Sequence, residues 1–228
     1  YVVPQIFYRG SYPNTILQEG SHGGFDVEVR VHFNAGAATS GTLSLLPSWG
    51  DKTPVTQSIK LPAGNTSATI KTTADAKDIK LWWPANTGRD HPLYNITVTF
   101  QESAAAADDD DDDATALLSA SRLIGFRHVA LVTGNDTDPE YIKTASTEEG
   151  SELGFGMFFR VNGAAVLTRG ANMIPMEEFE GRMNADAHAI LVQSAVDANF
   201  NMLRVWGGGM FLPDVFYDSC DAAGILVR

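Results

Sequence analysis

Residues 199–209 read NFNMLRVWGGG, and MFLPD follows directly at residues 210–214. Residues 202–205 are a short apolar run with one charge, and the run ends at three glycines, which predicts a buried parallel strand that opens into a loop. In α/β folds the chemistry lies at that end of the strands. Arg204 and Trp206 are two positions apart, so we expect both side chains on one face of the strand. A cation beside an indole suits a hydroxyl-rich or carboxylate ligand; the alternative is that Trp206 belongs to the core and the glycines form a flexible link.

The sequence around this stretch alternates between strand and helix signals. Asn162-Gly163 lies between two apolar runs and is the strongest short signal for a β-hairpin, while Asn184 suits the N-cap of a helix. The expected elements are hairpin strands at 157–161 and 165–169, a loop at 170–175, a helix at 185–198, a strand at 202–205, a helix at 213–223 and a strand from 225. This order predicts a parallel α/β fold.

The predicted α/β segment is too short for a closed barrel. An eight-stranded barrel takes ~250 residues by itself, so a barrel that begins here is unfinished. We therefore expect either that residues after Arg228 exist in the natural protein or that the chain pairs with another. The chain begins abruptly at Tyr1 and ends inside an apparent strand, and we expect both ends of a longer protein to be missing.

The first part of the chain carries the alternation of apolar and polar residues that is typical of half-buried strands. It is clearest in residues 25–33, which read FDVEVRVHF. Similar segments follow at 41–46, 55–61, 68–71, 79–82, 93–100 and 123–132, separated by turn signals. About seven short strands without a helix among them predict an immunoglobulin-like β-sandwich. The full prediction is multidomain β and α/β: this sandwich, followed by the N-terminal part of a (β/α)8 TIM barrel.

Two polar segments interrupt these patterns. Asp108 to Asp113 form an acidic tract, which cannot bury apolar surface and predicts a disordered insertion in a hairpin at about residues 103–120. A homopolymeric tract has no defined ligand geometry, so we expect no metal site there. The second polar segment is the expected linker at 135–152. It separates the sandwich, expected at 1–134, from the incomplete barrel, expected at 153–228.

Composition limits the partners of the chain. It has 228 residues, 44% of them hydrophobic and 19% charged, which is typical of soluble globular proteins. The net charge is −12, and 28 acidic residues minus the six of the tract leave 22 against 16 basic ones, or −6. This excess disfavours nucleic acid and anionic membranes as partners. Cys220 is the single cysteine, so no internal disulfide is possible, and no apolar run approaches the ~18 residues of a membrane span.

The adjacent indoles of Trp82 and Trp83 permit two interpretations. Both cannot point to one side of a strand, so one is expected in the sandwich core and the other at a domain contact or a ligand edge. A sugar platform is the sharper hypothesis, and structural packing is the more common role of large aromatic residues.

Several motifs resemble the β-mannosidases of glycoside hydrolase family 2. FFRVNG at 158–163, GANMIP at 170–175, NMLRVWGGG at 201–209 and FYDSCDAAGILV at 216–227 are similar to the start of the catalytic barrel in that family. LWWP at 81–84, LY at 93–94 and IGFR at 124–127 are similar to landmarks of the preceding sandwich domain. The resemblance covers most of the chain from about Lys80 onward. The Arg-x-Trp-Gly-Gly-Gly run distinguishes the mannosidase branch from the galactosidase and glucuronidase branches.

The resemblance implies a retaining hydrolysis of terminal β-D-mannose from oligosaccharides, by one glutamate as acid/base and one as nucleophile. Retaining enzymes hold the two carboxyl groups ~5 Å apart. In the family these glutamates lie on later barrel strands, so we expect them downstream of Arg228 and expect the chain alone to be inactive. No cofactor and no metal are implied; the partners are the oligosaccharide substrate and the remaining domains of the same polypeptide.

The resemblance also assigns substrate-binding roles. Arg204 matches the arginine expected near the nucleophile, with a structural salt bridge as the alternative, and Trp206 matches the indole at the sugar-binding mouth, beside Gly207. Asn172, at the end of the first barrel strand, is expected to orient a carboxylate or a hydroxyl group. Glu177 is assigned to the outer pocket.

The chain departs from the family pattern at two positions of this loop. Met173 stands where the family usually has Trp, and Glu177 where Asp is usual, so the outer pocket and the substrate preference are expected to differ. Glu177 and Glu178 are not expected to be the catalytic pair, because adjacent carboxylates in a loop diverge.

Other functions and the compartment stay open at this point. The enzyme alternatives are an exo-β-glucosaminidase or a β-galactosidase-like member of the family, and the non-enzyme alternative is a carbohydrate-binding or structural module. Asn65, Asn95 and Asn135 each begin an Asn-x-Ser/Thr pattern. About one or two such patterns arise by chance, so they add little to the secreted or lysosomal route that the family resemblance favours.

Overall fold

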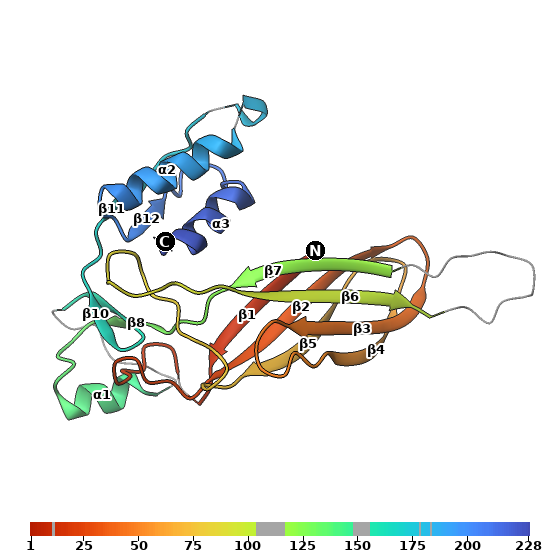
Figure 1. The fold of residues 1–228 in the computed structure, drawn as a ribbon, viewed down its shortest axis with the longest axis horizontal. Helices are drawn as coiled ribbons and strands as arrows, with labels where there is room; N and C mark the ends of the chain where they lie inside the picture. Colours follow the sequence, from red (N-terminus) through yellow and green to blue (C-terminus); the bar gives the residue numbers. More distant parts are fainter. Residues whose placement is uncertain (11, 104–116, 148–155, 178, 183) are drawn as a thin grey trace, which may run out of the picture. The chain divides into compact units, whose positions relative to one another are not determined.

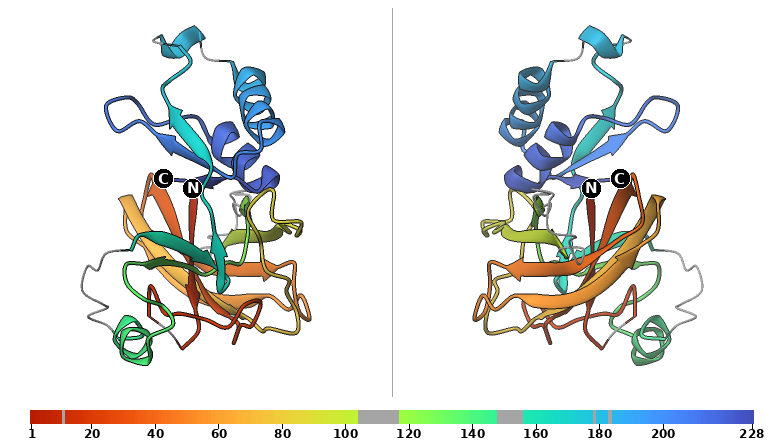
Figure 2. Two further views of the ribbon diagram at one scale, coloured as in Figure 1. Left: turned by 90° about the vertical axis from the view of Figure 1, so that its left-hand side faces the viewer. Right: turned by 90° about the vertical axis from the view of Figure 1, so that its right-hand side faces the viewer.

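The computed structural model describes residues 1–10, 12–103, 117–147, 156–177, 179–182 and 184–228. The chain divides into two compact units (Figures 1 and 2). The first comprises Tyr1–Arg9, Gly23–Ile79 and Tyr94–Ile124, and the second comprises Gly10–His22, Lys80–Leu93 and Gly125–Arg228. The acidic tract at Asp108 to Asp113 lies outside the described residues.

The first unit consists of two antiparallel sheets. One sheet has the strand order β1-β2-β5, and the other has the order β4-β3-β6-β7. The two sheets pack face to face, with β5 beside β3 and β4, and β1 beside β7 (Figure 1). The strands are β1 (Val2–Tyr8), β2 (Phe25–Ala35), β3 (Thr39–Pro47), β4 (Val55–Leu61), β5 (Gly64–Ala74), β6 (Tyr94–Glu102) and β7 (Leu117–Ile124).

Alternating side chains build the core between these sheets. In β2 the apolar positions from Phe25 to Val31 are buried while the intervening polar positions face outward, as the period-two pattern predicts. Leu43 and Leu45 of β3 and Ile96 of β6 fill the opposite side. Each such fully buried side chain contributes ~1.5–3 kcal/mol relative to its exposed state. Strand β1 was not predicted from the sequence.

Two strand predictions are wrong at the edge of this unit. Residues 79–82 form no strand, because the backbone N–H of Trp82 donates to Phe126 O (2.8 Å) in a loop-to-loop contact. The single strand expected at 123–132 is broken between β7 and β8 (Val129–Val132). Gly125 lies in the break against the Trp82 ring, where an added β-carbon would be 2.8 Å from Cδ1.

A small antiparallel sheet opens the second unit. Its strand order is β10-β9-β8, formed by β8, β9 (Phe158–Val161) and β10 (Ala164–Val166). The predicted hairpin at Asn162-Gly163 is confirmed, and both residues have the positive φ values (51° and 84°) that a type I′ turn requires. The second hairpin strand is shorter than predicted. A helix, α1 (Pro139–Ala145), lies within the segment that was expected to be a linker.

A parallel sheet with the order β11-β12-β13 completes the second unit. Its elements are β11 (Gly170–Met173), the 3-10 turn η1 (Glu180–Arg182), α2 (Ala185–Asp197), β12 (Met202–Val205), α3 (Asp214–Ala223) and β13 (Leu226–Val227). The predicted β, α, β, α, β order is therefore present. The loop expected at 170–175 is wrong in its first four residues, which pair in parallel register with β12.

Local signals explain where the two long helices begin and end. The side chain of Asn184 caps α2 by accepting a hydrogen bond from Asp186 N–H (2.9 Å), as predicted. Helix α3 ends at Gly224, whose φ of 75° is the left-handed conformation that favours glycine. One face of each helix packs in a common core with the outer side of the sheet, which includes Val192, Leu203 and Phe216. Among the described residues, no helix has the length and apolar character that crossing a membrane requires.

Candidate functional site

Asn172 and Arg204 lie side by side on neighbouring strands of the parallel sheet. They are register partners of β11 and β12, and Arg204 Nη1 donates to Asn172 Oδ1 (3.1 Å). Both residues are exposed. The structure thus brings together two side chains that lie 32 positions apart in the sequence.

The pair lines a hollow on the open face of this sheet. The hollow has a volume of about 360 Å³ and is lined by Thr168, Gly170, Ala171, Asn172, Met202 and Arg204. Residues Met202 and Arg204 share one face because they alternate with Leu203, which is buried against the helices. Arg204 forms no ion pair with any residue that the structure describes, so the salt-bridge alternative has no support within this part of the chain.

Asn201 fixes the start of these two strands. It is buried, its Oδ1 accepts from Arg169 N–H (2.8 Å), and its Nδ2 donates to Leu167 O (3.0 Å). Its carbonyl accepts from Leu226 N–H (2.9 Å), so one asparagine ties the entries of β11, β12 and β13 together. This role was missed from the sequence, where the available signal is a polar residue directly before an apolar strand.

Trp206 follows the last residue of β12 and extends its pairing. Its backbone N–H donates to Met173 O (3.0 Å), and its side chain is 46% exposed, whereas Trp49, Trp82 and Trp83 are each below 10%. Trp206 is therefore the accessible tryptophan of the chain, at the carboxyl end of the strand that carries Arg204.

Glycines 207–209 continue from Trp206 as a tight turn. Gly209 N–H donates to Trp206 O (3.1 Å). Space around Gly207 is open, since a β-carbon there would meet nothing within 4 Å. A β-carbon added at Gly208 or Gly209 would meet the Trp206 ring, and at Gly209 it would also meet Pro175. Gly208, Gly209 and Pro175 were not predicted as site residues.

Glu177 lies in the loop after β11, next to η1. Its Oε2 is 3.1 Å from Arg182 Nη2, and its Oε1 accepts a long hydrogen bond from Phe179 N–H (3.4 Å). The carboxylate is thus neutralised by a neighbour on its own loop. Glu178, the other acid considered at this point of the chain, lies outside the described residues.

The adjacent indoles of Trp82 and Trp83 are both buried in this fold. Trp82 is fully buried, donates from Nε1 to Asp221 O (2.8 Å) and carries Arg127 over its ring at 4.4 Å. Arg127 also pairs with Asp221 (3.7 Å). Burial raises the pKa of Asp221, and Arg127 opposes that shift. Packing, and not a sugar platform, is the role that this burial supports for Trp82.

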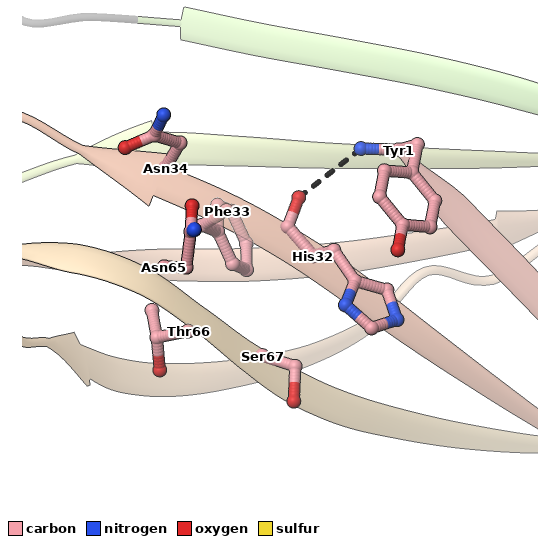
Figure 3. A pocket seen from close by; sticks show the side chains of 7 residues that line it. All are labelled: Tyr1, His32, Phe33, Asn34, Asn65, Thr66 and Ser67. Atoms are coloured by element: carbon pink, nitrogen blue, oxygen red, sulfur yellow. Dashed lines mark hydrogen bonds between the residues drawn. The ribbon is translucent and has the colours of Figure 1, made fainter.

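A hollow in the first unit lacks the groups that hydrolysis needs. Its volume is about 580 Å³, and Figure 3 shows the lining residues, which come from the start of the chain (Tyr1), from β2 (His32, Phe33 and Asn34) and from β5 (Asn65, Thr66 and Ser67). The Tyr1 ring stacks on His32 (4.4 Å between centroids), and the lining contains no carboxylate. General acid catalysis by a carboxyl group therefore has no candidate there.

No metal centre is formed by the residues that the structure describes. They contain no group of three or more His, Cys, Asp or Glu residues that could hold an ion. The chemistry that the site can supply is a cation, an amide and an indole, which bind and orient a ligand.

Sequence comparison relates the chain to curated β-mannosidases. It is 34% identical over 149 residues to the β-mannosidase of Capra hircus, and 36% identical over 148 residues to β-mannosidase A of Aspergillus terreus. Each match covers 65% of this chain and 14% of the relative. The matched part of the chain therefore spans about a seventh of the length of these relatives. No protein-family model matches the chain.

Solved structures share the fold over nearly the whole chain. The β-D-mannosidase of Dictyoglomus thermophilum matches with a TM-score of 0.65 and 25% identity, over 98% of this chain and 23% of that protein. The exo-chitosanase of Amycolatopsis orientalis matches with a TM-score of 0.62, over 97% of this chain and 22% of that protein. Its identity is 20%, so this second likeness concerns the fold alone.

Proposed function

Since the chain is a homologue of the β-mannosidases of glycoside hydrolase family 2 over 65% of its length, we propose that it is the part of a retaining glycoside hydrolase that holds the sugar. The substrate is terminal β-D-mannose of an oligosaccharide. The observation that carries this proposal is the Asn172–Arg204 pair in the open hollow, with Trp206 at the end of the same strand.

Each residue of the site has a role that its chemistry suits. Arg204, with no carboxylate partner among the described residues, keeps a nucleophilic carboxylate ionised when one is brought beside it. Asn172 orients Arg204 and offers its amide to a carboxylate or a hydroxyl. Trp206 stacks on the apolar face of the sugar ring, the open space at Gly207 admits the sugar, and Glu177 borders the outer pocket.

The two catalytic glutamates are proposed to come from sequence after Arg228. A retaining mechanism needs carboxyl groups ~5 Å apart, one to protonate the leaving oxygen and one to attack the anomeric carbon. The described residues of the site carry no such pair. Their share of the reaction is binding and electrostatic positioning.

The proposed architecture follows from the same kinship. The proposed division is an immunoglobulin-like sandwich at 1–134, a linker at 135–152 that contains helix α1, and a segment at 153–228 that carries the first strands and helices of a (β/α)8 barrel from β11 onward. Three neighbouring parallel strands in chain order, connected by helices, support the barrel, which needs five more strands to reach eight. The three-plus-four arrangement of antiparallel strands supports the sandwich.

A second candidate within the family is an exo-acting glucosaminidase. The two departures from the family pattern, at Met173 and Glu177, are the observations that favour a different sugar. The family usually has Trp at position 173. In this chain Met173 is buried in the core behind the sheet and does not reach the sugar. The carboxylate of Glu177 forms an ion pair with Arg182.

The decisive assay compares nitrophenyl β-mannoside, β-glucosaminide and β-galactoside with the full-length protein that contains this chain. The proposal predicts turnover of the mannoside, and none by residues 1–228 alone. Arg204→Met should lower kcat by ~100-fold or more, because it removes a preorganised charge. Arg169→Met is the matched control. Arg169 is also exposed and directly precedes β11, at the end of the strand away from Asn172, so this variant should leave kcat unchanged. Turnover by residues 1–228, or preference for another sugar, contradicts the proposal.

A further inference from the structure

The glycines after Trp206 are not required by backbone conformation. Gly209 N–H donates to Trp206 O (3.1 Å), which closes a turn with Gly207 and Gly208 at its centre. None of the three has a φ in the left-handed range, so an L-residue can adopt each backbone conformation. Any requirement for glycine at these positions must therefore lie in the space around each of them.

The space differs sharply between the three positions. A β-carbon at Gly207 would meet nothing within 4 Å. At Gly208 it would lie 2.5, 2.7 and 2.9 Å from Cζ2, Cε2 and Cη2 of Trp206. At Gly209 it would lie 2.9 Å from Pro175 Cγ and 3.3 Å from Trp206 Cε3.

The three distances at Gly208 also show the direction of approach. An atom approaching Cζ2 in the plane of the ring would be much farther from the two neighbouring ring carbons than from Cζ2 itself. The three distances are nearly equal, so the added atom would lie above the ring face. Gly208 therefore covers one face of the six-membered ring of Trp206 at closer range than any other residue type permits.

We infer that Gly208 and Gly209, with Pro175 behind Gly209, form a backing that holds the Trp206 indole, and that Gly208 and Gly209 are positioning residues for the sugar. The inference rests on the proposed function for its ligand, the apolar face of a pyranose ring. Backbone packed against one face excludes water there and limits rotation of the side chain, while the 46% exposure of Trp206 leaves surface for the ligand. A binding group held in place before the ligand arrives loses less entropy on binding.

This arrangement replaces the interpretation of residues 207–209 as a flexible link. In a flexible link the glycines would have no close neighbours. Here a β-carbon at Gly208 or Gly209 would meet the ring at 3.3 Å or less, whereas the space at Gly207 is open. Gly208 and Gly209 therefore have little room for a side chain, whereas Gly207 has room. The sequence alone does not show this difference, because all three residues are glycine.

The geometric part is tested by fluorine NMR on the full-length protein that contains this chain, labelled with 5-fluorotryptophan. Trp206→Phe identifies the resonance of residue 206. Gly208→Ala should shift that resonance, because its methyl group must displace the ring by ~1 Å to restore ordinary carbon contacts. Gly207→Ala adds a methyl group one residue away, without meeting the ring, and should leave the resonance in place. Equal behaviour of the two variants overturns the inference.

The functional part is tested by steady-state kinetics on a nitrophenyl β-mannoside. Gly208→Ala should lower kcat/KM by ~10- to 100-fold, mainly through KM, because a displacement of ~1 Å in a positioning group has effects of this size. Gly36→Ala, where a β-carbon meets nothing within 4 Å, should have no effect. In a Trp206→Ala background Gly208→Ala should cause no further loss, since the group that it displaces is gone.

The outcomes separate this inference from the proposed function. A loss in the Trp206→Ala background as large as in the wild type means a general structural effect of Gly208 and overturns the positioning role. An unchanged KM in Gly208→Ala, together with a shifted fluorine resonance, also overturns it. If the wild-type protein hydrolyses no β-mannoside, the proposed function fails, whereas the fluorine experiment still decides whether Gly208 holds the indole.

Discussion

Replacement of Asn162 by glycine should destabilise the second unit far more than its position in a hairpin turn suggests. Asn162 has a φ of 51° and is 1% exposed. Its Oδ1 accepts from His128 N–H (2.9 Å), and its Nδ2 donates to Trp82 O (2.9 Å). Glycine keeps the left-handed backbone and removes both side-chain hydrogen bonds.

The magnitude follows from the groups that lose their partner. His128 and Trp82 are 7% and 0% exposed, so water does not readily replace the amide. Each unsatisfied buried group costs ~1–3 kcal/mol, or ~2–6 kcal/mol for the two. Relief of left-handed strain in an L-residue returns ~1 kcal/mol. We expect a net loss of about 3 kcal/mol in the free energy of unfolding.

Urea unfolding followed by tryptophan fluorescence measures this loss. Asn199→Gly is the matched control, because Asn199 has a φ of 66° and is exposed. Its unfolding free energy should stay within ~0.5 kcal/mol of the wild type, or rise. The reasoning is refuted if Asn162→Gly is no more destabilising than this control.

Three further predictions concern the parallel sheet and its helices. Gly170→Ala should cost more than ~3 kcal/mol, because its methyl group collides with Met202 O in the adjacent strand, whereas Gly181→Ala, with nothing within 4 Å, should be neutral in thermal unfolding. Burial raises the pKa of Cys220 to about 12, so iodoacetamide at pH 8 should label the thiol only after denaturation; rapid native labelling would contradict its burial. Asp221 has a pKa raised above 3.8, mainly by burial, so the folded state holds its proton more tightly than the unfolded state. The free energy of unfolding of the wild type, relative to that of Asp221→Asn, should therefore fall as pH rises from about 4 through the raised pKa. An increase of this relative stability with pH would contradict the raised pKa.

Local patterns predicted the elements whose physics is local. The alternation in β2, the Asn162-Gly163 hairpin, the Asn184 cap and strand β12 are confirmed, because each depends on a few neighbouring residues. Helix α1 has signals of its own, an Asp138 cap followed by Pro139, but the polar composition of the segment favours a linker.

The errors arose where distant pairing decides the structure. Strand β11 begins Gly-Ala-Asn, which are weak strand formers, and its register with β12 makes it a strand. Residues 79–82 have a strand-like composition, yet the contacts of Trp82 with Phe126 and Asp221 hold them in an irregular conformation.

Residue types indicated part of the site, and spatial arrangement supplied the rest. The spacing of Arg204 and Trp206 at a strand end marked them as candidates, but the hydrogen bond from Arg204 to Asn172 depends on the register of a strand that was not expected. The contacts of Gly208 with the indole depend on the path of the turn, which a run of identical glycines does not reveal.

The most direct test of the proposed function is covalent trapping of the nucleophile in the full-length protein. A 2-deoxy-2-fluoro-β-mannosyl fluoride should accumulate a glycosyl-enzyme, because a retaining mechanism passes through a covalent intermediate. Peptide mass spectrometry then locates the sugar. We predict that it is attached to a glutamate after Arg228; attachment to a carboxylate within residues 1–228, such as Glu177, or no attachment at all, would contradict the assignment of the sugar site.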